Sequence, residues 1–250
     1  MVEKEGRDTV SFGFREVPRE AKQGLVRAVF DRVAERYDVM NDLMSLGVHR
    51  LWKDTLVDRL APRADEAILD LAGGTGDIAF RIRERGTARV TVADINSQMV
   101  LRGRDRMVDN GTLAGIDWTV GDAQALPFAN SAFAATTMAF GIRNVTDIPA
   151  ALAEIYRVLA PGGRFLCLEF SRVTVPLIER LYDAYSFAVL PRLGAAVAGD
   201  RDAYAYLVES IRRFPDQATF AAMLGAVGFE HVRFRNLSGG IAAIHHGWRL

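Results

Sequence analysis

The chain has 250 residues, 50% of them hydrophobic and 25% charged, which is ordinary globular usage and excludes disordered and collagen-like proteins. Its 31 Lys and Arg side chains balance 31 Asp and Glu side chains, so no net field directs it to nucleic acid, and we expect no nucleic-acid partner. The single cysteine excludes an internal disulfide framework, and the four histidines form no HExxH pair, so we expect no metal site.

The N-terminal end, residues 1–22, is expected to be a polar tail without the apolar core of a secretory signal. The remaining residues, 23–250, are expected to form a single domain. The most apolar stretch, 184–199, is interrupted by Pro191 and Arg192 and is shorter than the roughly 20 residues of a membrane span. We therefore expect a cytoplasmic protein that lies, at most, at the inner face of the cell membrane.

Residues 23–60 predict two N-terminal helices with a break near 38–41. From residue 67 onward, short apolar runs alternate with helical patterns. The runs predict strands at 67–71, 89–94, 116–120, 133–139, 164–169, 232–234 and 241–244. The helical patterns predict helices at 77–85, 97–110, 148–159 and 215–227, the second capped by Ser97 and the third ended by Pro161-Gly162-Gly163. This alternation predicts an α/β fold with a Rossmann-like, mostly parallel sheet of seven strands and helices on both faces.

An insertion follows the fifth strand, over residues 172–213, and it is too apolar to be a plain solvent loop. Both this insertion and the helices of residues 23–60 are candidates for a lid or a substrate cover. The alternative is that they add to the core or form an oligomer face. The composition of these segments does not separate the two interpretations.

The loop after the first strand, Asp70–Asp77, contains three glycines, which allow a sharp turn and a close approach of the backbone to a ligand. Gly74, Gly76 and Ala79 fit the GxGxx[GA] pattern of dinucleotide binding. Asp94 ends the second strand, where an acid that binds a ribose is expected. An NAD(P)-dependent oxidoreductase is therefore one candidate.

Charge favours a different ligand. Asp70 and Asp77 flank the loop, whereas a helix N-terminus that binds a diphosphate should be free of carboxylates. The same acids suit the sulfonium and ammonium groups of S-adenosylmethionine. Asp122 and Ala123 follow the third strand and can bind an adenine edge through the carboxylate and the backbone N–H. Alternatively, Asp94 and Asp122 only cap the ends of their strands.

The segments LDLAGGTGD, ADI and GDAQALPF resemble those of class I S-adenosylmethionine-dependent methyltransferases. Further segments resemble signatures of the ubiquinone/menaquinone biosynthesis C-methyltransferases: residues 37–45 with His49 and Trp52, 140–145, 157–171, 182–187 and 215–217. The likeness covers nearly the whole chain from about Phe30. One departure is Ala139, which stands where some relatives have a serine that contacts the cofactor, so only its backbone could make that contact.

The resemblance implies a class I methyltransferase fold and S-adenosylmethionine as the cofactor, bound by Gly73, Thr75, Asp94, Asp122 and Ala123. It implies methyl transfer to a ring carbon of a polyprenyl benzoquinol (2-polyprenyl-6-methoxy-1,4-benzoquinol), of demethylmenaquinol, or of both. Other interpretations stay open: the same fold acting on another lipid or phenolic compound, or a non-catalytic subunit. A polyprenylated quinol as substrate makes contact with a membrane surface a hypothesis, as is a homo-oligomer or a quinone-biosynthesis complex.

The substrate carbon becomes nucleophilic when a neighbouring hydroxyl, with a pKa near about 10, loses its proton. His49 titrates in a useful range and is a candidate base, although it is also a candidate for a hydrogen-bonded helix residue. Arg143 is a candidate anchor for the developing oxyanion, and Asn144 could orient a hydroxyl or a water. Arg143 and Asn144 could instead form a capped turn. Tyr37 and Asp38 also remain candidates for the base.

Overall fold

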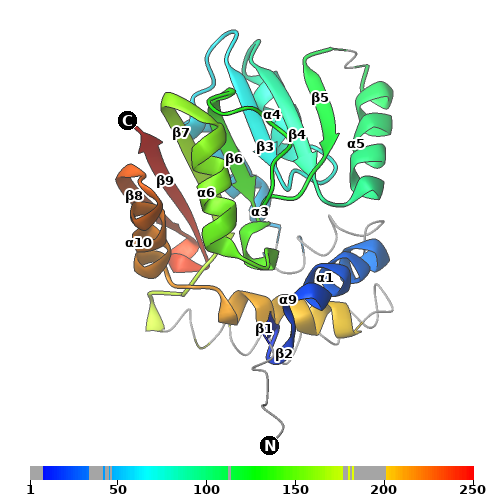
Figure 1. Cartoon of the computed structure of the whole chain (residues 1–250), viewed down its shortest axis with the longest axis vertical. Helices are drawn as coiled ribbons and strands as arrows, with labels where there is room; N and C mark the ends of the chain where they lie inside the picture. The colour runs from blue at the N-terminus through cyan, green and yellow to red at the C-terminus, as the bar shows by residue number, and fades with distance from the viewer. Residues whose placement is uncertain are drawn as a thin grey trace, which may run out of the picture.

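The computed structural model of the chain describes residues 8–33, 42, 45, 47–111, 114–176, 180, 182 and 201–250. Within these residues, seven strands form one sheet in the order β5-β4-β3-β6-β7-β9-β8 (Figure 1). Their bounds are β3 Ala67–Leu71, β4 Arg89–Asp94, β5 Ile116–Val120, β6 Phe133–Ala139, β7 Leu159–Phe170, β8 Glu230–Leu237 and β9 Ala242–Arg249. The first five run parallel to one another, and β9 is antiparallel to both β7 and β8. The predicted α/β fold with a mostly parallel sheet is confirmed.

Helices cover both faces of the sheet. The described helices are α1 Arg19–Val33, α3 His49–Leu60, α4 Asp77–Glu84, α5 Ser97–Asp109, α6 Ile148–Val158, α9 Arg201–Arg213 and α10 Gln217–Val227. Buried residues of α3 and α4 belong to one hydrophobic cluster, and those of α6 and α10 belong to another on the opposite face. Since both faces are covered, the central strands are apolar throughout rather than alternating. Ile68 and Leu69, neighbours that point to opposite faces, are both fully buried.

Several boundaries differ from the sequence prediction. The side chain of Asn96, not Ser97, caps α5, accepting hydrogen bonds from the backbone N–H groups of Gln98 and Met99. Helix α6 ends at Val158, and β7 begins at the next residue, before the Pro-Gly-Gly sequence. That sequence lies in a bulge, because the pairing of β6 with β7 shifts there. The last two strands are longer than predicted, because each pairs along its length with a neighbour.

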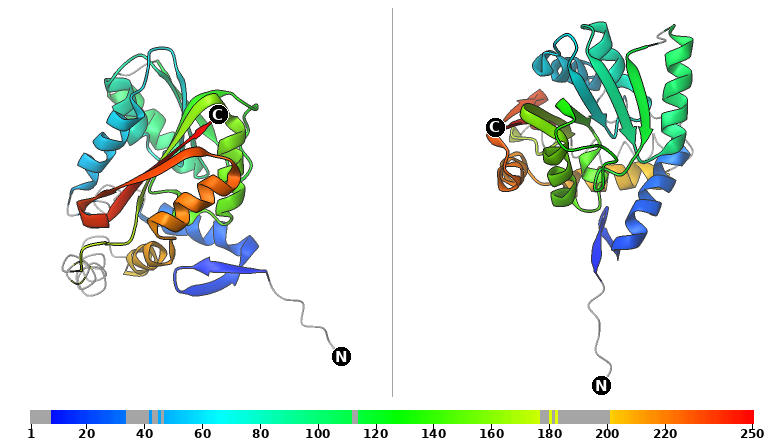
Figure 2. Two further views of the ribbon diagram at one scale, coloured as in Figure 1. Left: turned by 90° about the vertical axis from the view of Figure 1, so that its left-hand side faces the viewer. Right: turned by 45° about the horizontal axis from the view of Figure 1, so that its top comes forward.

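The N-terminal segment is not merely a polar tail. β1 Thr9–Phe12 and β2 Arg15–Pro18 form an antiparallel hairpin that leads into α1, and Figure 2 shows the hairpin beside α1 and α9. Phe12 is buried and stacks on Tyr206 of α9, with 4.2 Å between the ring centroids. The hairpin is therefore held by a contact with a helix that is far away in sequence.

Much of the predicted lid lies outside the described residues. Of the insertion 172–213, the structure describes 172–176, 180, 182 and the helix α9. The predicted break at 38–41 also lies outside them. Helix α9 packs on α1 and on the hairpin, at the end of the sheet where the parallel strands end (Figure 1).

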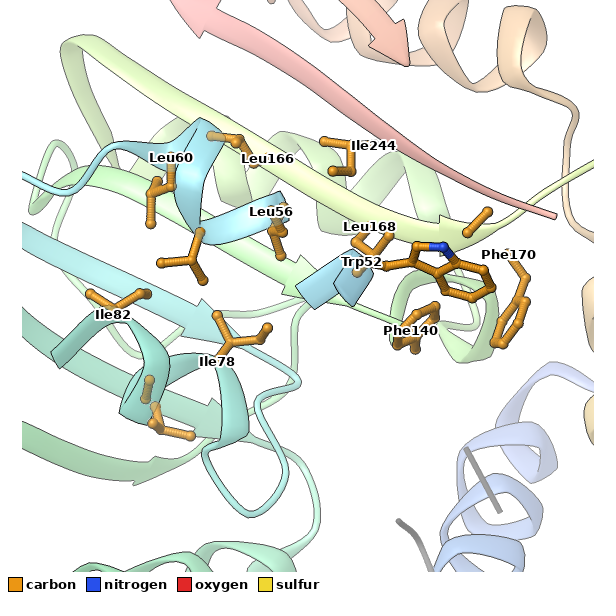
Figure 3. Packing of buried hydrophobic residues seen from close by; sticks show 14 of the residues in the cluster. Trp52, Leu56, Leu60, Ile78, Ile82, Phe140, Leu166, Leu168, Phe170 and Ile244 are labelled. Carbon is orange, nitrogen blue, oxygen red and sulfur yellow. The ribbon is translucent and has the colours of Figure 1, made fainter. Parts of the chain in front are cut away.

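An aromatic group closes the core next to the carboxyl ends of the strands. Trp52 of α3 packs edge-on against Phe170, with 6.0 Å between the centroids, and Phe170 lies 4.8 Å from Phe140 (Figure 3). The indole N–H of Trp52 donates to the Ser238 hydroxyl at 3.0 Å. Phe140 follows β6 directly and has a φ of 57°. This packing holds the turn after β6 in an unusual backbone conformation.

Candidate functional site

A cavity lies beyond the carboxyl ends of β3, β4, β5 and β6, where ligands of doubly wound sheets bind. Its floor and walls come from the segments that follow these strands, and its roof comes from α1. The residues that line it are Gln23, Val26, Arg27, Leu71, Ala72, Gly74, Asp94, Ile95, Asn96, Met99, Gly121, Asp122, Ala123, Gln124, Met138, Phe140, Gly141, Asn144, Val145 and Thr146. We call it the Asp94 cavity. It brings together four of the predicted site residues: Asp94, Asp122, Ala123 and Asn144.

The glycine loop forms one wall of this cavity. Gly74 has a φ of 56°, and a Cβ atom there would meet no atom within 4 Å, so its exposed side faces open space. Gly73 is different, because a Cβ there would lie 2.7 Å from the Asp70 carboxylate. Gly76, with a φ of 82°, precedes α4 and provides no side-chain cap. The loop therefore leaves open space in front of Gly74 at a helix N-terminus, while the N–H groups of its three glycines already donate to the Ala93 carbonyl, the Asp94 carboxylate and the Gly73 carbonyl.

Asp94 is fixed at the wall of the cavity by two backbone groups. One carboxylate oxygen accepts from the Gly74 N–H at 2.9 Å, and the other accepts from the Asn96 N–H at 2.8 Å. Burial raises the pKa of Asp94, and these two hydrogen bonds oppose the shift. Each oxygen keeps a lone pair, so the carboxylate can still accept from two ligand hydroxyl groups.

Asp122 is bridged to the roof of the cavity. Its Oδ1 accepts from the Gln124 N–H at 2.9 Å, and its Oδ2 accepts from the side-chain amide of Gln23 in α1 at 2.8 Å. The side-chain amide of Gln124 also donates to Oδ2, at 3.2 Å, so an exocyclic amino group of a nucleobase that used this oxygen would have to displace one of the two amides. Asn96 makes a second bridge to α1, donating to Asp31 at 2.6 Å.

Asp77 does not present free negative charge, which corrects the expectation from the sequence. The Lys53 ammonium donates to its Oδ2 at 2.8 Å, and Arg81 donates to its Oδ1 at 3.1 Å. Although burial opposes the shift, the charge of Lys53 lowers the pKa of Asp77. The acid is therefore ionised but compensated, and the negative groups that face the Asp94 cavity are Asp94 and Asp122.

Asp70 is fully buried at the end of β3. Its Oδ1 accepts from the Thr137 hydroxyl at 2.9 Å, and its Oδ2 has no hydrogen-bond partner among the described residues. Burial raises the pKa of Asp70 from 3.8 to about 7. At neutral pH this side chain is thus divided between its neutral and its ionised form.

A second, smaller cavity lies beside the first, on the other side of the glycine loop. It is lined by Lys53, Asp70, Ala72, Gly73, Gly74, Thr75, Asp77, Ile78, Ala139 and Phe140. Two predicted cofactor residues, Gly73 and Thr75, lie here rather than in the Asp94 cavity. The two cavities share Ala72, Gly74 and Phe140, so they adjoin.

Arg143 and Asn144, in the 3-10 turn η2 (Ile142–Asn144), take different positions. The guanidinium of Arg143 is 1% exposed and donates at 2.7 Å both to Glu169 and to the Phe140 carbonyl. It does not line the Asp94 cavity. Asn144 lines the cavity, and its side-chain oxygen accepts from the Tyr206 hydroxyl at 3.1 Å. Arg143 is therefore placed to hold the turn, and Asn144 is placed to meet a ligand.

His49 lies apart from both cavities, at the start of α3. Its Nε2 is 2.9 Å from the Asp42 carboxylate, and the Ser45 hydroxyl accepts from its backbone N–H at 3.1 Å. Burial lowers the pKa of His49, and the neighbouring Asp42 opposes the shift. This geometry favours a hydrogen-bonded helix residue over a base in contact with substrate. Tyr37 and Asp38 lie outside the described residues.

Reasoning from the sequence missed Gln23, Lys53 and Glu169. Gln23 and Lys53 lie on helices that precede the sheet, and only the packing of those helices reveals what they contact. Glu169 is the penultimate residue of β7, the strand next to β6, so its position near the carboxyl end of a predicted strand was an available signal. In the described part of the chain, no group of three His, Cys, Asp or Glu side chains is placed to hold a metal ion. The described helices include none with the length and apolarity needed to span a membrane.

Known proteins resemble this chain at two levels. Residues 15–249 match the model of the ubiE/COQ5 methyltransferase family. The "Ubiquinone/menaquinone biosynthesis C-methyltransferase UbiE" of Paracoccus denitrificans is 57% identical over 251 residues, covering 100% of both chains. The protein of the same name in Brucella abortus is 55% identical, covering 96% of this chain and 91% of that one.

Among solved structures, a Thermotoga maritima SAM-dependent methyltransferase, described as a possible histamine N-methyltransferase, has a TM-score of 0.65 at 18% identity. The match covers 90% of this chain and 100% of that one. At this identity the likeness concerns the fold, which is the class I methyltransferase fold predicted from the sequence. The family match and the full-length relatives go further: the chain belongs to the ubiE/COQ5 methyltransferase family.

Proposed function

We propose that the chain transfers a methyl group from S-adenosylmethionine to a ring carbon of a polyprenyl benzoquinol (2-polyprenyl-6-methoxy-1,4-benzoquinol), of demethylmenaquinol, or of both. The names of the full-length relatives support this substrate class. The observation that carries the proposal is the Asp94 carboxylate, fixed by the Gly74 N–H above the glycine loop and facing a cavity that also holds Asp122.

The residues of the cavity fit a nucleoside with a sulfonium side chain. Asp94 is the acceptor for the two ribose hydroxyls. Asp122 and the backbone N–H of Ala123 are the partners of the adenine edge, with the Gln23 amide giving way. Gly73 and Thr75 border the part of the site that lies past the glycine loop. When bound, the cofactor supplies an electrophilic methyl group on a positively charged sulfur.

The residues of the chain then position the acceptor ring. Asn144 faces the cavity, so its side chain is the proposed contact to a quinol hydroxyl. Arg143, paired with Glu169, fixes the Phe140 carbonyl and thereby the turn that carries Asn144. Apolar side chains, such as Met138 and Phe140, exclude water from the place where the ring carbon must meet the methyl group.

The place of action follows from the substrate class. A polyprenyl tail resides in a bilayer, so we place the protein in the cytoplasm and at the inner face of the membrane during turnover. The single domain of residues 23–250 would then use its insertion, residues 172–213, as a lid or membrane contact. Flotation with liposomes tests this part, and a protein that stays at the bottom of the gradient with and without quinol would contradict it.

The main test measures two things: which cofactor the protein binds, and which cellular quinones it methylates. Calorimetric titration should give binding of S-adenosylhomocysteine and none of NADH, whereas binding of NADH alone would favour an oxidoreductase. With the gene deleted, mass spectrometry of cellular quinones should show a pool that lacks one methyl group. Complementation by the wild-type gene should restore that pool, and Asn144→Ala should not, with Asn130→Ala as a control outside the cavity. An unchanged quinone pool would refute the substrate class.

A further inference from the structure

Tyr206 of α9 contacts the candidate site from behind its wall. It is not among the residues that line the Asp94 cavity, and it is 5% exposed. Its hydroxyl donates to the side-chain oxygen of Asn144 at 3.1 Å. Its ring stacks on Phe12 of the hairpin, with 4.2 Å between the centroids and 20° between the planes. Tyr206 therefore connects the N-terminal hairpin to a residue that lines the cavity.

The hydroxyl of Tyr206 determines which way the Asn144 amide is turned. Burial raises the pKa of Tyr206, although the charge of Arg143 opposes the shift, so the hydroxyl keeps its proton in neutral solution. A buried O–H needs an acceptor. Among the described residues, the acceptor of this hydroxyl is the Asn144 side chain. An amide accepts through its oxygen and donates through its nitrogen, so the oxygen of Asn144 must face Tyr206.

The orientation of the amide decides what Asn144 offers to a ligand. With its oxygen used by Tyr206, the –NH2 group is the part left for a ligand in the cavity that Asn144 lines. In the described part of the chain, its two N–H donors have no other partner. Asn144 is therefore suited to an oxygen that accepts a hydrogen bond, rather than to a hydroxyl that donates one.

The backbone of the turn that carries Asn144 is held without Tyr206. The Asn144 N–H donates to the Gly141 carbonyl at 3.0 Å. The preceding residue, Arg143, is fixed by its bond of 2.7 Å to Glu169. Since other contacts fix the backbone, the bond from Tyr206 acts on the side-chain amide of Asn144.

We propose that Tyr206 is a positioning residue for methyl transfer: it turns the Asn144 amide so that its N–H donors meet the ionised oxygen of the acceptor ring. This inference rests on the proposed transfer to a quinol. The ring carbon becomes nucleophilic when the neighbouring hydroxyl loses its proton, and a donor at that oxygen favours the ionised form.

The bonds and charges of the transfer show why this oxygen matters. The ring carbon bonds to the methyl carbon with an electron pair that the ionised oxygen supplies, and the pair of the broken C–S bond stays on sulfur. The ring carbon then loses its hydrogen as a proton to water, which restores the aromatic ring. Negative charge is therefore greatest on the oxygen before the methyl group is transferred, when the N–H donors of Asn144 stabilise it.

Tyr206→Phe tests this role, because it removes the hydroxyl and keeps the ring that stacks on Phe12. The rate of methyl transfer to the benzoquinol with a short prenyl chain, kept reduced, is measured from pH 6 to 10. In wild-type protein, kcat should rise with pH until the bound quinol is ionised. Without a correctly turned donor, this apparent pKa should rise by about one unit, and kcat at neutral pH should fall about tenfold or more. The affinity for S-adenosylhomocysteine should not change.

Two variants of Asn144 separate the donor from the fold. Asn144→Ala removes the donor, and adding Tyr206→Phe to it should cause no further loss, because both substitutions act on one hydrogen bond. Asn144→Asp keeps the size of the side chain and replaces the N–H donors by a carboxylate. It should lower kcat by at least as much as Asn144→Ala.

The matched control is Tyr156→Phe. It removes the hydroxyl of a tyrosine in α6 that lines neither the Asp94 cavity nor the smaller one, and it should keep the wild-type pH profile. The inference is overturned if Tyr206→Phe keeps that profile, if its loss adds to that of Asn144→Ala, or if Asn144→Asp is as active as wild type. Wild-type protein that binds S-adenosylhomocysteine but methylates no quinol would refute the proposed function, and this role with it.

Discussion

Replacing Asp70 by asparagine should change how stability depends on pH. In the folded protein, burial raises the pKa of Asp70 from 3.8 to about 7. The unfolded chain therefore releases this proton near pH 4, while the folded chain keeps it until near pH 7. The contribution of Asp70 to stability is therefore fully present below the pKa of this group in the unfolded chain. It is lost as the pH rises from there to about 7. At about 1.4 kcal/mol per pH unit, the loss approaches about 4 kcal/mol.

Urea unfolding at pH 5, 6, 7 and 8 measures this effect. Asparagine does not titrate, and its side-chain oxygen can still accept from the Thr137 hydroxyl. The free energy of unfolding of Asp70→Asn minus that of wild type should rise by about 1.4 kcal/mol per pH unit up to about pH 7 and then level off. Ionisable groups that do not interact with Asp70 are shared and cancel, which leaves only its charged neighbours Asp77, Asp94 and Lys53 to contribute. A difference that stays constant from pH 5 to 8 would show that Asp70 is ionised in the fold.

Three further substitutions test the site and its support. Asp94→Asn removes the charge of the proposed ribose acceptor, so calorimetry should show S-adenosylhomocysteine binding weakened by about tenfold or more. Glu169→Gln leaves the buried Arg143 guanidinium without its counter-ion, and urea unfolding should show a loss of about 3–5 kcal/mol. Gly103→Ala places a Cβ against the Trp118 ring, and thermal unfolding should show a loss of about 1–3 kcal/mol.

Each of these predictions has a control or a contrary result. Gly24→Ala, in α1, has no atom within 4 Å of the new Cβ and should stabilise by about 0.5–1 kcal/mol. Unaltered stability in Glu169→Gln would mean that the Arg143 pair contributes nothing to the fold. Undiminished affinity in Asp94→Asn would remove Asp94 from the cofactor site. Equal unfolding temperatures for Gly103→Ala and Gly24→Ala would contradict the packing argument.

The sheet could be predicted from the sequence where local signals were complete. Strands such as Ala67–Leu71 and Arg89–Asp94 match the prediction residue for residue, because each apolar run is bounded by an acid or a glycine turn. The hairpin that begins at Thr9 was missed, since its burial depends on Tyr206 of α9. A polar composition does not show that one aromatic side chain, Phe12, anchors the segment.

The candidate site, like the sheet, could be predicted from the sequence only in part. That Asp94 and Asp122 line one cavity follows from their positions after parallel strands, because these strands end at one edge of the sheet. The charge balance at Asp77 could not be predicted, as it depends on how α3 packs against α4 and brings in Lys53. The burial of Arg143 likewise depends on Glu169, which lies in a different strand.

If Asp122 binds the nucleobase as proposed, its hydrogen bond with Gln23 makes α1 a participant in ligand binding. Any nucleobase that donates to the same Asp122 oxygen competes with the amide of the roof. The net gain from that contact is then the difference between two similar bonds rather than the full strength of one. If a bound nucleobase displaces the Gln23 amide, thermodynamic linkage requires that it loosens α1 and that anything fastening α1 through this contact weakens nucleoside binding by the same factor.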